Sequence, residues 1–118
     1  MQTIPNKSKV EKIEYHPKYS VICSIGKAPF HGVIDITYYP DETLLEFESF
    51  EKWLKSIADD SMTIEDLARL VFDKLAVLGD IPLCVIVHAR TTVHAPVSAT
   101  ISREGGCFSE TNRIKRKE

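Results

Sequence analysis

The spacing of apolar residues changes twice along this chain, and that change limits the possible folds more than any other feature of the sequence. From Gly32 to Tyr39 apolar and polar residues alternate, which is typical of a half-buried strand. Between residues 47 and 78 the apolar residues return every three or four positions, as on helices that cover a core. β-rich runs resume at residues 83–89 and 97–102. Strands therefore flank a helical middle, and an α+β class is predicted.

Two helices are expected in that middle part. The first carries an apolar stripe over residues 47–57, and a polar run at 59–61 ends it. Thr63 is expected to cap the second helix together with Asp66, and this helix runs to about Gly79.

The β-rich runs predict four strands in two pairs. Residues 19–25 and 32–39 form the first pair, and residues 83–89 and 97–102 form a hairpin closed around 92–96. The order ββααββ predicts a four-stranded antiparallel sheet with both helices on one face. Such a sheet leaves two edges and one face open. Closure into a barrel of several subunits would protect them, although a polar face or a short edge strand can serve as well.

One domain accounts for most of the chain. A chain of 118 residues can bury roughly two-thirds of the surface that it exposes when unfolded. We assign residues 1–18 to an N-terminal extension, residues 19–103 to the domain and residues 104–118 to a polar, basic tail. The domain is therefore expected to hold a single core.

Composition argues against several classes of function. The net charge of −2 gives no general attraction to nucleic acid, so such binding would need a local basic patch. The three cysteines are odd in number and lack framework spacing, and the N-terminus lacks the apolar core of a signal peptide. No apolar stretch is long enough to span a membrane. A cytoplasmic protein without a membrane role is expected.

Cys23 and Glu65 are the first candidates for chemistry, although each also has an ordinary explanation. Cys23 ends an apolar run just before a turn-forming stretch, but a buried, unreactive cysteine fits that position equally well. Glu65 lies in the first turn of the second predicted helix, where the helix dipole favours a carboxylate. If Glu65 instead faces a cavity, its two oxygens can accept paired N–H donors.

No metal site is predicted. His31, His88 and His94 accompany the three cysteines, but they lack the spacing of metal ligands. The common glycine-rich nucleotide motifs and the nucleophile elbow of hydrolases are also missing from the sequence.

An ordered set of residues resembles the core of the nitrile reductases that reduce 7-cyano-7-deazaguanine. The set consists of Cys23, Pro29, Tyr38, Pro40, Asp41, Glu46, Ser49, Trp53, Ser56, Glu65 and Asp66. The resemblance covers about residues 19–102. It implies a tunnelling fold (T-fold) and a ring of identical subunits, a pentamer or decamer, with pockets between subunits.

The resemblance also implies roles for individual residues. Cys23 matches the cysteine that adds to the substrate nitrile to give a covalent thioimide, and Glu65 matches the glutamate that holds the guanine-like edge. Thiolate is the soft nucleophile that a nitrile carbon requires. Glu46 and Ser49 match the family's helix-start motif and are further candidates for substrate binding.

The sequence departs from the family pattern at two groups of positions. Phe30 replaces the family's proton-donating aspartate, which makes His31 the candidate acid, and Ile64 replaces a histidine before Glu65. Glu48 and Glu51 replace two lysines, and residues 91–94 lack the family's arginine and glycines. Carboxylates there would repel the phosphates of NADPH.

These departures favour one reaction over three alternatives. The small archaeal QueF-like relatives add ammonia to the thioimide and form the amidine of archaeosine, with no cofactor. The alternatives are a 7-cyano-7-deazaguanine reductase with an altered NADPH site, a catalytically silent purine- or pterin-binding protein of the same fold, and a pterin-type cyclohydrolase. The last would normally need a Cys/His metal site. Free base, tRNA and DNA all remain open as the substrate.

Overall fold

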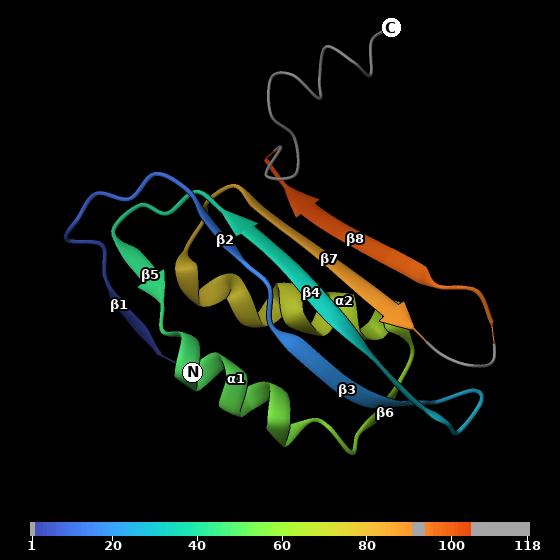
Figure 1. The fold of residues 1–118 in the computed structure, drawn as a ribbon. Helices are drawn as coiled ribbons and strands as arrows, with labels where there is room; N and C mark the ends of the chain where they lie inside the picture. Colours follow the sequence, from blue (N-terminus) through green and yellow to red (C-terminus); the bar gives the residue numbers. More distant parts are fainter. Residues whose placement is uncertain (1, 91–93, 105–118) are drawn as a thin grey trace, which may run out of the picture.

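The computed structural model describes residues 2–90 and 94–104 (Figure 1). The strands are β1 (Thr3–Pro5), β2 (Ile13–Tyr15), β3 (Lys18–Cys23), β4 (Pro29–Tyr38), β5 (Thr43–Leu45), β6 (Ser61–Met62), β7 (Leu83–Arg90) and β8 (Val97–Arg103). The helices are α1 (Phe47–Ser56) and α2 (Ile64–Lys74), and a 3-10 turn, η1 (Leu75–Leu78), extends α2. The predicted α+β class is confirmed.

The main sheet is larger than the predicted one. It has six strands in the order β6-β3-β4-β7-β8, with β2 also paired to β4. β2 and β3 follow each other along the same side of β4, and Pro17 lies in the break between them, where its carbonyl accepts a hydrogen bond from the N–H of Ile34 at 2.9 Å. The prediction missed β2 and β6. The pair of β3 and β6 is parallel, whereas the other pairs are antiparallel.

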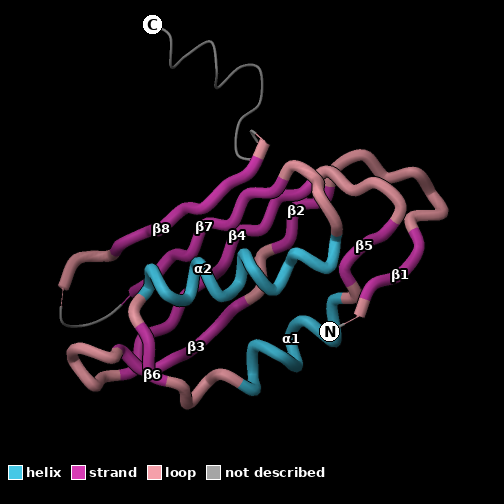
Figure 2. The backbone as a smooth tube through the Cα atoms, turned by 180° about the vertical axis from the view of Figure 1, so that it is seen from behind, coloured by secondary structure: helices cyan, strands magenta, loops and turns pink. Residues whose placement is uncertain are grey.

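Both helices cover the same face of this sheet, as Figure 2 shows from the helical side. The alternation expected from the sequence places Ile34, Ile36 and Tyr38 in the core beneath them. α1 buries Phe50 and Leu54. Within residues 2–90 and 94–104, the opposite face of the sheet carries no helix (Figure 1).

The start of α2 follows the predicted capping pattern. The Thr63 hydroxyl accepts a hydrogen bond from the N–H of Asp66 at 3.1 Å, and the Asp66 carboxylate accepts one from the N–H of Thr63 at 3.4 Å. The α-helical part ends at Lys74, and Gly79 closes the 3-10 turn with a φ of 92°. This conformation suits glycine because it has no Cβ.

Residues assigned to the N-terminal extension pack onto the domain. β1 pairs with β5, and β2 pairs with β4. The buried side chain of Asn6 donates to the carbonyls of Val10 and Asp41, both at 3.0 Å. Of the predicted tail only Glu104 lies within the described residues. Among the residues described, no helix is long and apolar enough to cross a membrane.

Candidate functional site

Cys23 lies at the base of the turn that joins β3 to β4, and backbone hydrogen bonds fix its position. Its N–H donates to the carbonyl of Ala28 at 2.8 Å, and its carbonyl accepts from the N–H of Lys27 at 2.9 Å. The N–H of Gly26 donates to the Cys23 sulfur at 3.4 Å. This contact holds the sulfur, the nucleophilic atom of a reactive cysteine, at the turn.

The short strand β6 brings the start of α2 beside Cys23. In the parallel pair Cys23 is the register partner of Met62. The carbonyl of Met62 accepts from the N–H of Ser24 at 3.2 Å. Since α2 begins at Ile64, two residues after Met62, its first turn must lie next to the cysteine.

Cys23 and Glu65 line one cavity of about 260 Å³. Its lining residues are Cys23, Ile25, Gly26, Ala28, Phe30, Thr63, Ile64, Glu65, Ala89, His94 and Val97. The volume is near the lower end of the range for small-molecule sites, roughly 300–1,000 Å³. The two residues singled out from the sequence are therefore brought together within one subunit.

The first turn of α2 forms part of the wall of this cavity. Thr63, Ile64 and Glu65 are the cap and first two residues of the helix, and all three line the cavity. Backbone N–H groups at a helix N-terminus have no partner within the helix and carry partial positive charge. The helix N-terminus and the Glu65 carboxylate thus lie in the same wall of the cavity.

His94 also lines the cavity, although the sequence suggested it only as a poor metal ligand. Its Nδ1 lies 2.7 Å from the carbonyl oxygen of Ala95. A carbonyl only accepts hydrogen bonds, so the proton is assigned to Nδ1, and Nε2 carries the lone pair that can accept a proton. Its place depends on the register of β7 and β8, in which Ala89 pairs with Val97. No local sequence pattern reports that register.

Apolar side chains form the wall where the family has proton-exchanging groups. Phe30 and Ile64 both line the cavity and are 5% and 9% exposed. Phe30 packs edge-on against Tyr19, with ring centroids 6.0 Å apart. Neither side chain can transfer a proton. Any acid or base in this cavity must come from another residue.

Three further residues predicted from the sequence lie outside the cavity. His31 follows Phe30 on β4, and its side chain therefore lies on the opposite face of the sheet. The Glu46 carboxylate caps α1 by accepting from the N–H groups of Glu48 and Ser49, at 2.8 and 3.0 Å. The Ser49 hydroxyl accepts from the N–H of Gln2 at 3.0 Å. Catalysis by His31 and substrate binding by Glu46 and Ser49 stay predictions.

Glu51 occupies one of the positions where the nitrile reductases have lysine. Its carboxylate binds a side chain of the neighbouring strand β2. The Tyr15 hydroxyl donates to its carboxylate at 2.6 Å. Burial and this hydrogen bond raise the pKa of Tyr15 well above its ordinary value. Glu51 therefore ties α1 to β2. Among the described residues, no three His, Cys, Asp or Glu side chains gather as metal ligands would.

Comparison with known proteins agrees with the resemblance seen in the sequence. No family model matches the chain. The chain is 26% identical over 110 residues to a protein from Gloeobacter violaceus named NADPH-dependent 7-cyano-7-deazaguanine reductase, a match that covers 87% of this chain and 80% of the relative. The crystal structure of the archaeosine synthase QueF-Like in the apo form has the same fold, with a TM-score of 0.74 and 18% identity over 81% of this chain and 96% of that one. The chain is thus similar in sequence to a protein named as a 7-cyano-7-deazaguanine reductase, and it shares the fold of the archaeosine synthase QueF-Like.

Proposed function

We propose that this protein is an enzyme that attacks the nitrile of 7-cyano-7-deazaguanine with Cys23 and converts it with ammonia to the amidine. The observation that carries the proposal is the shared cavity of Cys23 and Glu65. Those two residues are the ones that the family resemblance assigns to nucleophilic attack and to recognition of the base.

The proposed reaction proceeds in two balanced steps. The Cys23 thiolate adds to the nitrile carbon, and the nitrogen takes up one proton to give a thioimide. Ammonia then adds to the same carbon, the C–S bond breaks, and one proton of ammonia passes to the departing Cys23 sulfur, so that the product is the amidine and the thiol is restored. The nitrile and ammonia supply all atoms of the product. No electrons are transferred, so the reaction needs no nicotinamide cofactor.

We assign the proton transfers to His94. Nε2 of His94 takes the proton from the Cys23 thiol and returns it to the nitrogen that becomes negative when the nitrile is attacked. Two observations support this assignment. His94 shares the cavity with Cys23, and its Nδ1 is already committed to the carbonyl of Ala95. The apolar Phe30, at the family's acid position, makes a replacement necessary.

Glu65 has the chemistry to orient the base. Its carboxylate accepts two parallel N–H donors, such as the ring N–H and exocyclic amine of a guanine-like edge. The capping box uses the side chains of Thr63 and Asp66, and among the described residues the Glu65 carboxylate has no ion pair or hydrogen bond of its own. Glu65 also lies in the first turn of α2, where the helix dipole favours a carboxylate.

A reductase is the second candidate because the relative from Gloeobacter violaceus bears that name. Glu48 and Glu51 argue against it, since NADPH phosphates would meet carboxylates where the reductases have lysines. The contact between Glu51 and Tyr15 holds one of these charges in place. We therefore favour the reaction with ammonia, on a free base or on the base within tRNA, in a cytoplasmic ring of identical subunits.

Intact-protein mass spectrometry with 7-cyano-7-deazaguanine tests the proposal. We expect an adduct with the mass of one base, located by peptide mapping on Cys23 and abolished in Cys23→Ala. No adduct, or an adduct on Cys84 or Cys107, contradicts the proposal. Ammonium should then release an amidine, whereas loss of NADPH absorbance that depends on the base would favour the reductase instead.

A further inference from the structure

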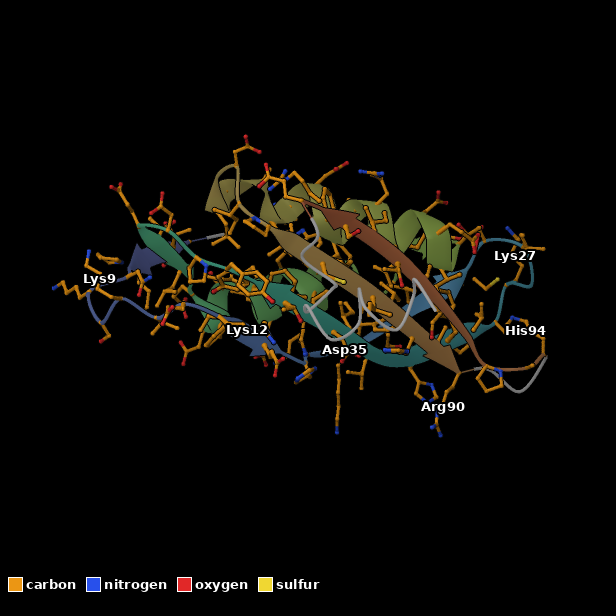
Figure 3. All side chains as sticks on the ribbon, turned by 90° about the horizontal axis from the view of Figure 1, so that it is seen from above. Lys9, Lys12, Lys27, Asp35, Arg90 and His94 are labelled. Carbon is orange, nitrogen blue, oxygen red and sulfur yellow. The ribbon has the colours of Figure 1, made fainter. Side chains whose placement is uncertain are left out.

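Three basic side chains gather on the open face of the sheet, where β3, β4 and β7 lie side by side. His31 on β4 is the register partner of Arg90 on β7. Two residues further along β4, Val33 is the register partner of Lys18 on β3 and of His88 on β7. Cross-strand neighbours have Cβ atoms about 5 Å apart. Figure 3 shows Arg90 pointing away from the helical side of the sheet.

A second cavity of about 550 Å³ opens among these side chains. Its lining residues are Lys18, His31, Gly32, Val33, His88, Ala89, Arg90, Pro96, Val97 and Ser98. Within the described part of the chain, every ionisable side chain on this wall is basic. The cavity therefore has the electrostatic character of an anion site.

Within the described residues, three of these basic side chains have no acidic partner, and His88 alone pairs with a carboxylate, that of Asp35. Neither Lys18, His31 nor Arg90 forms an ion pair with any residue in 2–90 or 94–104. Like charges placed opposite each other on neighbouring strands lower stability. A bound anion would remove that cost.

The nearby carboxylate of Asp35 is already fully engaged. One of its oxygens lies 2.7 Å from Nδ1 of His16, and the other lies 2.6 Å from Nε2 of His88. Burial favours the protonated acid, but the hydrogen bonds from His16 and His88 outweigh burial and hold the pKa of Asp35 below its ordinary value. The other ring nitrogen of His88 meets the Ser98 hydroxyl at 2.7 Å. Asp35 thus orients His88, and among the described residues it forms no ion pair with Lys18, His31 or Arg90.

We propose that this cavity on the open sheet face binds a phosphate group through Lys18, His31 and Arg90. A guanidinium presents a planar pair of donors that fits phosphate oxygens, an ammonium adds a point charge, and an imidazole adds a further N–H donor. The ligand is either a free phosphate compound or a phosphodiester of RNA, which present the same oxygens. The inference does not depend on the proposed reaction at Cys23, because Lys18, His31 and Arg90 do not line the Cys23 cavity, although Ala89 and Val97 line both cavities.

Binding of a fluorescein-labelled ten-nucleotide RNA, measured by anisotropy without 7-cyano-7-deazaguanine, tests this site. Inorganic phosphate and adenosine monophosphate serve as competitors. Lys18→Gln and Arg90→Gln each remove one charge and nearly preserve side-chain length. Lys52→Gln, an exposed position on α1, makes the same change of net charge on the helical side. Circular dichroism checks that each variant folds.

We expect Lys18→Gln and Arg90→Gln each to raise the Kd for RNA about threefold or more and to flatten the salt dependence by roughly 0.7 in log–log slope. Lys52→Gln should bind like the unmodified protein. Competition by millimolar phosphate or the mononucleotide identifies a free phosphate compound, and competition only by longer RNA identifies a phosphodiester. The proposal is overturned if no phosphate ligand binds, or if Lys52→Gln weakens binding as much as Arg90→Gln.

Discussion

Cys23 and Met62 are register partners in the parallel pair of β3 and β6, and this pairing places the cysteine beside the first turn of α2. The pair is only two residues long, yet it joins parts of the chain that are some 40 positions apart. It fixes Glu65 in the wall of the Cys23 cavity. A single backbone contact therefore brings the proposed nucleophile and the proposed base-recognition residue into one site.

His94→Ala should slow the reaction of Cys23 with iodoacetamide about tenfold at pH 7, because a neighbouring imidazole that accepts the thiol proton promotes thiolate formation. The measurement is the alkylation rate of Cys23 at pH 7, followed by mass spectrometry. His31→Ala distinguishes the two histidines. If it slows alkylation while His94→Ala does not, the role assigned here to His94 belongs to His31.

Glu65→Gln should weaken binding of 7-cyano-7-deazaguanine. The substitution exchanges an acceptor oxygen for an NH₂ donor that faces the donors of the base, which costs about 1–3 kcal/mol, or roughly 5- to 100-fold in Kd. Calorimetry on Cys23→Ala protein measures this without covalent reaction. Glu48→Gln is the matched control, since Glu48 occupies the first turn of α1. If the two variants bind 7-cyano-7-deazaguanine equally well, Glu65 does not contact the base and is only a residue of the first helical turn.

Local patterns predicted much of this fold from the sequence. The pair Thr63 and Asp66 marked the start of α2 because a capping box involves only neighbours in the chain. β6 could not be predicted in the same way, because two residues carry no period. β2 was not predicted either. Pro17 lies between β2 and β3 and interrupts the alternation of apolar and polar residues that the two strands along β4 would otherwise share.

The candidate site was predicted only in part, for a related reason. Cys23 and Glu65 each had an ordinary explanation, and only the resemblance to the nitrile reductases linked them. His94 owes its place in the cavity to the register of a hairpin, which is a contact between strands and not a local pattern. His31 was selected for being next to Phe30, but neighbours on a strand point to opposite faces.

Gly32→Ala should destabilise the fold strongly. A Cβ at Gly32 would lie 1.8 Å from the carbonyl oxygen of His88, which also accepts a hydrogen bond from the Tyr19 hydroxyl at 2.9 Å. Since the obstacle is backbone on the paired strand β7, we expect a loss of about 2 kcal/mol or more in the free energy of unfolding, measured in urea. Gly26→Ala is the control, because its nearest atom would be the Cys23 sulfur at 3.9 Å. Comparable losses in both variants would contradict the steric account.

Asp35→Asn should lower stability at pH 7, and the loss should vanish in acid. Because hydrogen bonds from His16 and His88 hold the pKa of Asp35 below its ordinary 3.8, the ionised carboxylate stabilises the fold above that value. This stabilisation disappears as the pH falls through the lowered pKa. We expect a difference on the order of 1 kcal/mol at pH 7 in urea unfolding, and little at pH 2.

Asp73→Asn provides the matched control for this prediction. Asp73 forms an ion pair with Arg69 one turn earlier on α2, but both side chains are well exposed. Its removal should change stability only slightly at either pH. A difference for Asp35→Asn that stays constant from pH 7 to pH 2 would mean that the carboxylate charge is not the cause.

The protein should assemble into a ring-shaped homo-oligomer through the edges of its main sheet. β8 forms one edge, and within the described residues no strand of the same chain covers its outer side (Figure 1). β6 is too short to cover β3 along its length at the other side. Unpaired edge groups favour pairing with a second copy, and a closed ring leaves no edge open.

Thr100→Lys adds a charge to the exposed edge strand and should shift the assembly toward smaller species. Light scattering after size-exclusion chromatography measures the mass of both proteins. A monomeric mass for the unmodified protein at micromolar concentration would show that the edges are protected within one subunit, and the proposed sites would then have to function without a neighbouring copy.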